Sequence, residues 1–517
     1  MSSLSESSIL AGAAGGTGAA APFQVDNSIR FDAGDDQYMH RTFSGAGNRT
    51  KWTWSSWIKI SGGMNDLVAA SNQYWGIWHN DNSTSDSNRF GLYLSGASNE
   101  SMDYNIHIEG HGTHWRVTRR ALRDPSAWYH IVVVWDTGNG DANERIRVYI
   151  NGERQSDFRE FNNPTKDATS GINLGDKHSI GASENISNGN FYYHWDGIMA
   201  EIFFLDGYAY NAEYFGEFSS EGIWRPIDYK SNTGDFGTNG FYLNGSGLSG
   251  TTINDQSDNS NNFTLVGGQA AHDVLPDTPT NNFAIFNIAG IHHPSHGFTN
   301  TEAGLEFTCP YTGSGSPYYW MPATIAVKDQ PFYMEFYLVT AIGGGADVYN
   351  YAGMGIFGHS HAWNQQETFT SGTSVGGAAY YSFNLGRTLS NNNNQTSLGG
   401  NSIATSDDIV SFYYAGSGNA WLRINGNFID YSAAIDNSFS GTPTFSNIDT
   451  TDYITFWVYH VQGGYGWTGV ANFGQDSTFG GRTSAGTNSD EHGNGLFKYS
   501  VPSGAIALCT KSLAEVS

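Results

Sequence analysis

The sequence predicts an all-β protein built of two sandwiches in tandem, and three observations support this. Of the 517 residues, 15% are aromatic and 65 are glycine, whereas only 14% are charged. Aromatic and β-branched strands joined by Gly and Asn turns are typical of antiparallel sheets. A chain of this length exceeds one ordinary core. Finally, one pattern occurs twice, at 145–158 and 421–431: an alternating strand, an Asn-Gly pair that favours a type I′ turn, and a return strand.

Residues 1–26 are rich in Ser, Ala and Gly and predict a flexible tail. We expect this tail to anchor the protein to a partner protein. Its stretch ILAGAAGGTGAAA is too weakly apolar for a secretory signal and too short to cross a bilayer. Synthesis in a cytoplasm without export, and no membrane insertion, are therefore expected. The formal net charge of −25 repels phosphate backbones, so nucleic acid is not an expected partner.

Residues 27–228 predict the first sandwich. A short helix is expected within 211–218, and Trp52, Trp54 and Trp57 lie in mid-strand, where a core is expected. The strand candidates are 28–31, 51–60, 74–78, 90–94, 128–135, 145–150 and 197–205.

Residues 229–285 are polar and rich in Asn, Gly and Asp, with two strand candidates, and predict a semi-ordered connector that ends near Pro276 and Pro279. Residues 286–517 predict the second sandwich. Its main strand candidates are 331–339, 353–358, 407–416 and 421–428.

The order of these motifs resembles known families. SIRFDAGDDQYM, WTWSSWIK, WYHIVVVWD, RVYINGER and GIMAEIFFLDGYAYNAEYF together resemble a LamG-like domain of the concanavalin A-like lectin fold. PFYMEFYLV, GMGIFG, DDIVSFYYAG and WLRINGNF resemble a SPRY-like domain. The resemblance implies two tandem concanavalin A-like jelly-roll sandwiches preceded by an N-terminal tail.

Two further segments resemble virion structural proteins of marine tailed bacteriophages: DQSDNSNNFTL with DTPTNNF, and NFGQDSTFGG with GAIALCTKSL. This resemblance implies a protein of the virion, made in the host cytoplasm, such as a tail fibre or appendage that binds host-surface glycan. It also implies a homo-oligomer, most simply a trimer, joined to other virion proteins by its tail. Two alternatives stay open: a capsid decoration or head-fibre protein with only structural contacts, and a polysaccharide depolymerase.

Enzyme motifs are absent from the sequence. It lacks the ExDxxE run that places paired carboxylates on one strand, and it lacks GxSxG, HExxH and P-loop patterns. We therefore expect no catalysis and no cofactor. Cys309 and Cys509 are expected to be reduced thiols rather than a disulfide or a metal site.

The stretch 72–88 carries the residue types that bind sugars: aromatic rings for C–H faces, and Asn, Asp and His for hydroxyls. Asp81 and Asp86 could hold Ca²⁺ there, whereas Trp75 and Trp78 could instead be core residues. The histidines at 292, 293 and 296 could form a metal-binding tract, but we expect them, together with His359 and His361, to be loop residues or oligomer contacts. The candidate carbohydrate-binding residues are Trp75, Trp78, His79, Asn80, Asp81, Asn82, His361 and Trp363.

Overall fold

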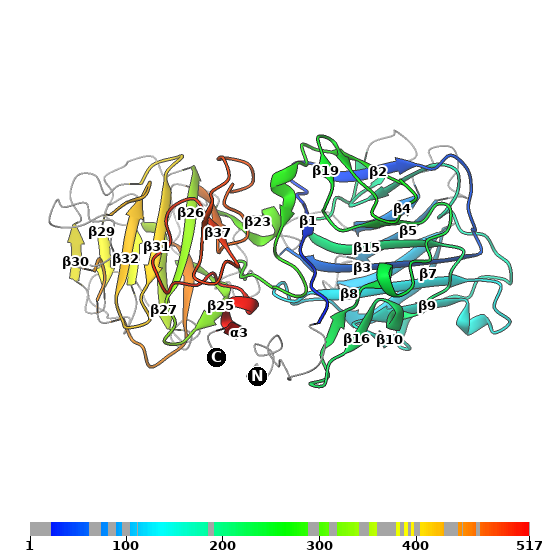
Figure 1. Cartoon of the computed structure of the whole chain (residues 1–517), viewed down its shortest axis with the longest axis horizontal. Coiled ribbons are helices and arrows are strands. Elements are labelled where there is room, and N and C mark those ends of the chain that lie inside the picture. Colours follow the sequence, from blue (N-terminus) through cyan, green and yellow to red (C-terminus); the bar gives the residue numbers. More distant parts are fainter. Residues whose placement is uncertain are drawn as a thin grey trace. The chain divides into compact units, whose positions relative to one another are not determined.

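A computed structural model confirms the all-β fold class, and the chain divides into two compact units (Figure 1). The first unit ends at Asn282 and includes Thr301–Ala303, and the second comprises Phe283–Asn300 and Gly304–Ser517. Among the described residues the α-helices are short: α1 (Tyr229–Asn232) and α3 (Thr510–Glu515). The described residues are 22–61, 74–80, 89–95, 104–110, 112–184, 191–287, 299–309, 318–340, 351–358, 379–382, 387–390, 394–397, 404–428, 443–446, 448–461 and 466–515.

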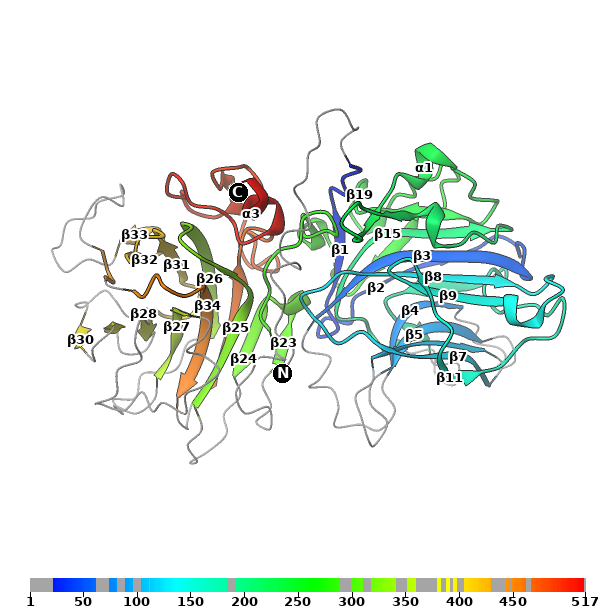
Figure 2. The ribbon, with the colours of Figure 1, turned by 90° about the horizontal axis from the view of Figure 1, so that it is seen from below.

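The first unit is a sandwich of two antiparallel sheets, which form separate layers in Figure 2. Across the first sheet the order is β10 (Glu153–Arg154), β9 (Ile146–Ile150), β8 (Tyr129–Asp136), β3 (Lys51–Ile60), β15 (Gly197–Asp206), β1 (Ser28–Phe31) and β22 (Val274–Leu275), with β18 (Phe241–Leu243) also paired to β15. Across the second sheet it is β11 (Phe158–Phe161), β7 (Thr113–Ala121), β6 (Asn105–Gly110), β5 (Phe90–Ser95), β4 (Tyr74–Asn80), β12 (Lys177–Ile180), β2 (Tyr38–Thr42), β21 (Phe263–Val266), β20 (Thr252–Ile253) and β19 (Leu248–Ser249).

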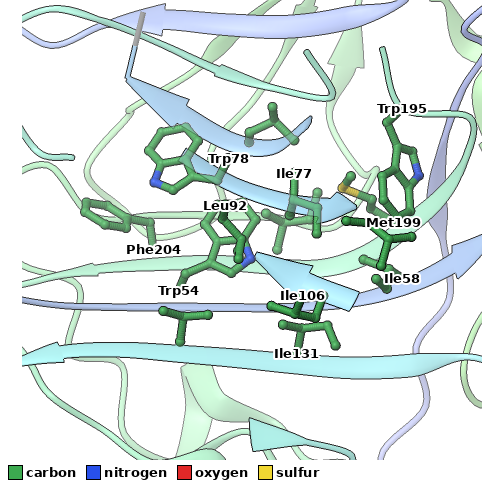
Figure 3. Packing of buried hydrophobic residues seen from close by; sticks show 14 of the residues in the cluster. Trp54, Ile58, Ile77, Trp78, Leu92, Ile106, Ile131, Trp195, Met199 and Phe204 are labelled. Atoms are coloured by element: carbon green, nitrogen blue, oxygen red, sulfur yellow. The ribbon is translucent and has the colours of Figure 1, made fainter. Parts of the chain in front are cut away.

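The core of this unit fills the space between the two sheets (Figure 3). Trp54 of β3 stacks on Trp78 of β4, with ring centroids 5.3 Å apart. Phe204 of β15 and Leu92 of β5 lie in the same buried cluster. The three tryptophans of β3 are buried as the sequence predicted, two of them between the sheets and Trp57 on the opposite face, because side chains alternate along a strand.

Residues 229–282 are part of the first unit and supply strands to its sandwich, and residues 283–285 belong to the second unit, which corrects the prediction of a connector over 229–285. Strand β18 pairs with β15 in one sheet, and β21 pairs with β2 in the other. Strand β22 pairs with β1 at the edge of the first sheet. These strands are short and flanked by polar turns, so their role depends on pairing partners distant in sequence rather than on a local apolar pattern.

The outer face of the first sheet is covered by the chain that follows β15. Val132 and Phe203 project from this face and pack against Phe215, Tyr229 and Tyr242. The short helix expected within 211–218 is one 3-10 turn, η5 (Ala212–Tyr214), followed by the hairpin β16 (Gly216–Phe218) and β17 (Trp224–Pro226). In the described part of the chain, further 3-10 turns are η4 (Ala142–Glu144), η6 (Ala271–Asp273) and η9 (Glu302–Gly304).

The second unit repeats the two-sheet plan. One sheet has the order β23 (Thr299–Thr301), β24 (Glu306–Cys309), β35 (Trp467–Asn472), β26 (Phe332–Thr340), β31 (Ile409–Tyr414), β32 (Ala420–Ile424) and β33 (Asn427–Phe428). The other has the order β25 (Tyr318–Val327), β34 (Ile454–Val461), β27 (Tyr351–Gly358), β28 (Ala379–Ser382), β29 (Arg387–Ser390) and β30 (Asn394–Ser397). A small hairpin, β36 (Asn488–Ser489) and β37 (Leu496–Phe497), lies near the C-terminus.

The C-terminal segment covers the outer face of the first of these sheets. Tyr333 of β26 packs against Phe497 and Ala507. Glu335 is fully buried beside it, and its carboxylate accepts backbone N–H bonds from Lys498 at 2.7 Å and Tyr499 at 2.8 Å. A buried carboxylate with several donors holds the covering segment in place.

Both Asn-Gly pairs form the predicted turns. Asn151 and Gly152 have φ of 50° and 76°, and Asn425 and Gly426 have φ of 51° and 78°. Positive φ at both central residues is the requirement of a type I′ turn. The two turns connect β9 to β10 and β32 to β33.

Replacing Gly152 by alanine is expected to destabilise the first unit by about 2–4 kcal/mol. The residue lies at φ 76°, and a Cβ there would sit 2.3 Å from Cε3 of Trp224. Gly140→Ala is the matched control, because nothing lies within 4 Å of its Cβ position. Urea unfolding followed by circular dichroism measures both variants, and equal midpoints would contradict the packing argument.

Candidate functional site

Half of the predicted sugar-binding residues are buried in the interior of the first unit. Trp75 and Trp78 are core residues, which is the alternative the sequence left open. His79 and Asn80 were predicted to lie in a loop, and this prediction is wrong: strand β4 continues through them and both are 1% exposed or less. The His79 ring packs on Tyr93 at 4.1 Å, and burial lowers its pKa to about 3. None of these four side chains is available to a surface sugar.

The other predicted residues lie outside the described part of the chain. These are Asp81, Asn82, His361 and Trp363, together with the possible Ca²⁺ ligand Asp86 and the histidines at 292, 293, 296 and 359. Their predicted roles stay predictions. Among the residues that the structure does describe, no group of three or more His, Cys, Asp or Glu side chains could hold a metal ion.

A second candidate site, distinct from the predicted residues, lies beside a β-bulge in β4. The pairing of β4 with β5 shifts between Gly76 and Trp78. The Gly76 N–H donates instead to the Tyr193 carbonyl at 2.6 Å, just after the hairpin of β13 (Ser183–Glu184) and β14 (Phe191–Tyr192). Tyr193 has φ of 59°, a left-handed conformation that is uncommon for a bulky residue. Such bulges and outliers gather at functional sites.

Aromatic side chains from β2, β4 and β14, with the residue after β14, form a group that we name the aromatic surface: Tyr38, Tyr74, Phe191, Tyr192 and Tyr193. Tyr38 stacks on Phe191 with centroids 4.2 Å apart and 16° between the rings. Tyr74 and Tyr193 meet edge to face at 5.7 Å. Tyr192 is 41% exposed and Tyr193 is 38% exposed, so both rings face solvent, and Tyr193 also contacts Tyr74.

Polar and charged groups surround the aromatic surface. Lys177 Nζ lies 4.6 Å from the centre of the Phe191 ring. His194 Nε2 lies 3.5 Å from the Asp36 carboxylate. On the side of Tyr74, the ring of His107 lies 5.2 Å away. Rings for C–H faces, with hydrogen-bonding groups at their edges, are the combination that sugar recognition requires.

The sequence analysis overlooked this site, although a signal was present. Residues 191–194 read FYYH, and Asn and Gly precede them. Consecutive aromatic residues on a strand point to opposite faces, so one face of such a run must leave the core. That argument could have identified Tyr192 or Tyr193 as exposed.

A buried serine–histidine pair lies elsewhere in the first unit, but its hydrogen bonds do not suit catalysis. Ser55 Oγ is 2.8 Å from His130 Nε2, and the Trp224 indole N–H donates to His130 Nδ1 at 3.0 Å. An indole nitrogen only donates, so Nδ1 is the acceptor and Nε2 carries the proton of the neutral ring. Burial lowers the pKa of His130 to about 3. His130 therefore has no lone pair directed at Ser55 and cannot act as its base.

Both cysteines are buried and free, as the sequence predicted. Burial raises the pKa of the Cys509 thiol to about 11 and raises that of Cys309 as well. Thiols with raised pKa are poor nucleophiles.

Of the helices in the described part of the chain, none has the length and apolar character to cross a membrane.

Comparisons with known proteins agree with the lectin-type fold of the first unit. Residues 32–208 match the family described as the concanavalin A-like lectin/glucanases superfamily. No curated protein matches the chain.

Several solved structures are similar to part of the chain. The SPRY domain of human HERC1 is 14% identical with a TM-score of 0.24, over 36% of this chain and 96% of that one. A heptameric SAP-like pentraxin from Limulus polyphemus is 18% identical with a TM-score of 0.26, over 37% and 80%. Tailspike protein 2 of Escherichia coli O157:H7 bacteriophage CAB120 is 14% identical with a TM-score of 0.24, over 37% and 27%. With the two-layer sandwich described above, the family match leads to one conclusion: residues 32–208 form a concanavalin A-like domain within an all-β chain.

Proposed function

We propose that this protein is a structural component of a tailed-phage virion that binds host-surface glycan through the aromatic surface of its first unit. The exposure of Tyr192 and Tyr193 on a fixed hairpin is the observation that carries the glycan-binding part. The virion part depends on the sequence resemblance of the segments at 255–265, 277–283 and the C-terminus.

The physical argument for a sugar ligand comes from the composition of the surface. Rings held by stacking and by the Gly76–Tyr193 hydrogen bond lose little conformational freedom when a ligand binds. Asp36, Lys177 and His194 supply acceptors and donors at the rim. The protein's net charge of −25 favours neutral sugars over acidic ones.

A single shallow site of this kind binds with about millimolar affinity, near −4 kcal/mol. Several copies on one particle raise the avidity roughly 10²–10⁴-fold without a new contact. A homo-oligomer, joined to other virion proteins through residues 1–26, is therefore part of the proposal. A virion protein with only structural contacts is the second candidate, and the experiment below distinguishes the two.

Tyr192→Ala is expected to weaken binding to host cells about fivefold per site, because it removes an exposed ring of the aromatic surface on which a sugar can stack. Phe218→Ala is the control, since Phe218 is 52% exposed in the same unit but lies on β16. Adsorption of fluorescently labelled full-length protein to host cells measures both.

Three results of this experiment are informative. Loss of adsorption in Tyr192→Ala but not in Phe218→Ala supports the site. Equal adsorption of wild type and Tyr192→Ala overturns it. A wild-type protein that does not adsorb at all overturns glycan binding and favours the purely structural role. Circular dichroism melting confirms that each variant is folded.

A further inference from the structure

A buried lysine and a buried aspartate meet a partly buried asparagine in the first unit. Lys59 lies in β3 and is 1% exposed, although its side chain carries an amine. Its Nζ lies 2.8 Å from Asp277 Oδ2 and 2.7 Å from Asn282 Oδ1. The contact between Lys59 and Asn282 joins residues 223 positions apart in the chain.

The local backbone places the aspartate and the asparagine side by side. Thr278 and Asn281 form an antiparallel bridge, with N–H to carbonyl distances of 3.1 and 3.0 Å. Asp277 and Asn282 are the next pair outward in this register, so they lie opposite each other. Both side chains reach the end of Lys59.

Further hydrogen bonds fix the orientation of both groups. The Trp128 indole N–H donates to Asp277 Oδ1 at 3.1 Å, which leaves Oδ2 toward the amine. The Asn282 Nδ2 group donates to the Ser126 carbonyl at 2.7 Å, which turns Oδ1 and the amide carbon toward Lys59.

The surroundings are apolar. Lys59 projects from the same face of β3 as Trp57, because side chains two apart share a face. That face is covered by a buried cluster that includes Trp57, Trp128, Ile198 and Leu275. Burial there lowers the pKa of the Lys59 amine, against the opposing effect of Asp277. Low polarity favours a neutral pair, amine and carboxylic acid, over two charges.

We propose that Lys59 and Asn282 react to form an intramolecular amide bond, with Asp277 as the proton-transfer group. The nucleophile is desolvated, the amide is held against it, and an acid–base group touches the nucleophile. This satisfies the positional requirements of acyl transfer. Neither oxidant nor cofactor is required.

The reaction balances as follows. Asp277 takes one proton from the Lys59 ammonium, and the freed lone pair attacks Cγ of Asn282 to form a C–N bond. A second proton passes from Nζ to Nδ2, the Cγ–Nδ2 bond breaks, and ammonia leaves. The products are a secondary amide, a protonated Asp277 and ammonia. The protein therefore loses the mass of one ammonia.

Mass spectrometry of the purified full-length protein under denaturing conditions tests this directly. The expected mass is that of the chain minus one ammonia, and proteolysis should release a branched peptide joining residues 59 and 282. A chain at its full sequence mass, with separate peptides containing 59 and 282, overturns the proposal. A loss of one water with residue 59 joined to 277 also overturns it, because it assigns the acyl group to the aspartate.

Variants distinguish the chemistry from the fold. Asn282→Ala removes the acyl group, and Lys59→Arg removes the nucleophile while keeping a cation beside Asp277. Both should abolish the ammonia loss. Lys230→Arg is the matched control, because Lys230 contacts Asp258 at the surface, and its ammonia loss should equal that of wild type. Ammonia loss that persists in Asn282→Ala contradicts the assignment whatever the stability of the variant.

Discussion

Replacing Trp78 by alanine is expected to destabilise the first unit by about 3–5 kcal/mol, the range for deleting a large buried aromatic side chain. Trp78 is fully buried at the centre of the core. It stacks on Trp54 at 5.3 Å and on His178 at 5.1 Å, and it meets Phe241 at 5.4 Å. Neighbouring strands fix these partners, so they cannot collapse into the cavity left by the indole.

A second substitution separates packing from hydrogen bonding. Within the described residues, the Trp78 indole N–H has no acceptor. Trp78→Phe removes this buried donor and part of the ring, so its cost should be well below that of the alanine variant. Urea unfolding followed by far-UV circular dichroism measures both. An alanine variant as stable as wild type would show that Trp78 is not a core residue.

The second large effect concerns pH: the first unit should be more stable near pH 5 than near pH 8. Asp32 is buried at the end of β1, and its pKa is raised from the ordinary 3.8 to about 7, first by burial and then by the charge of Glu302. Burial and the charge of Asp32 likewise raise the pKa of Asp196. Arg30 offsets part of this repulsion, since it pairs with Asp273 at 2.9 Å and Glu302 at 3.2 Å.

The sign follows from linkage. The folded-state pKa of Asp32 exceeds its unfolded value, so the folded state binds the proton more tightly. This contribution to stability is complete below pH 3.8 and is lost as pH rises through about 7. Between about pH 5 and pH 8 the loss for Asp32 alone is about 3 kcal/mol.

Asp32→Asn should flatten this pH dependence, because it removes the carboxyl group that titrates. The asparagine oxygen can still accept the Gly34 N–H bond, which is 2.7 Å long in the wild type. Asp258→Asn is the control: the Asp258 side chain is 88% exposed, and the pH dependence of this variant should match that of wild type. Urea midpoints at several pH values report the result. A wild-type protein that becomes more stable from pH 5 to pH 8 would contradict the assignment of Asp32.

The sequence predicted the positions of strands better than the domain to which they belong. The predicted bounds 28–31 and 51–60 are those of β1 and β3, since both segments combine apolar periodicity with flanking polar turns. The strand candidates at 240–243 and 262–266 are β18 and β21, but the sequence analysis assigned them, together with β22, to a connector. Each has two to four residues and is stabilised by pairing with β15, β2 and β1, which local sequence does not reveal.

Site prediction failed where burial depends on tertiary context. His79 and Asn80 look like loop residues because both are polar, yet β4 runs between β5 and β12 in the middle of its sheet and buries them. Conversely, Tyr192 and Tyr193 look like core residues, yet the hairpin that carries them presents them to solvent. Residue type predicted the kind of chemistry, whereas only strand pairing decided which side chains are accessible.

The pairing of β1 with β22 has a mechanical consequence. Ser28 lies opposite Leu275 and Ile29 lies opposite Val274, so the chain enters β1 and leaves β22 at the same end of the pair. A pulling force applied between the chain before Ser28 and the chain after Leu275 would separate the two strands at that end. Their hydrogen bonds would then break one after another rather than all together. Paired strands resist such peeling weakly. With a covalent link between Asn282 and Lys59, a force on the chain after residue 282 would act on β3 instead of β22. Strand β3 lies within the sheet and is paired on both sides, with β15 and β8.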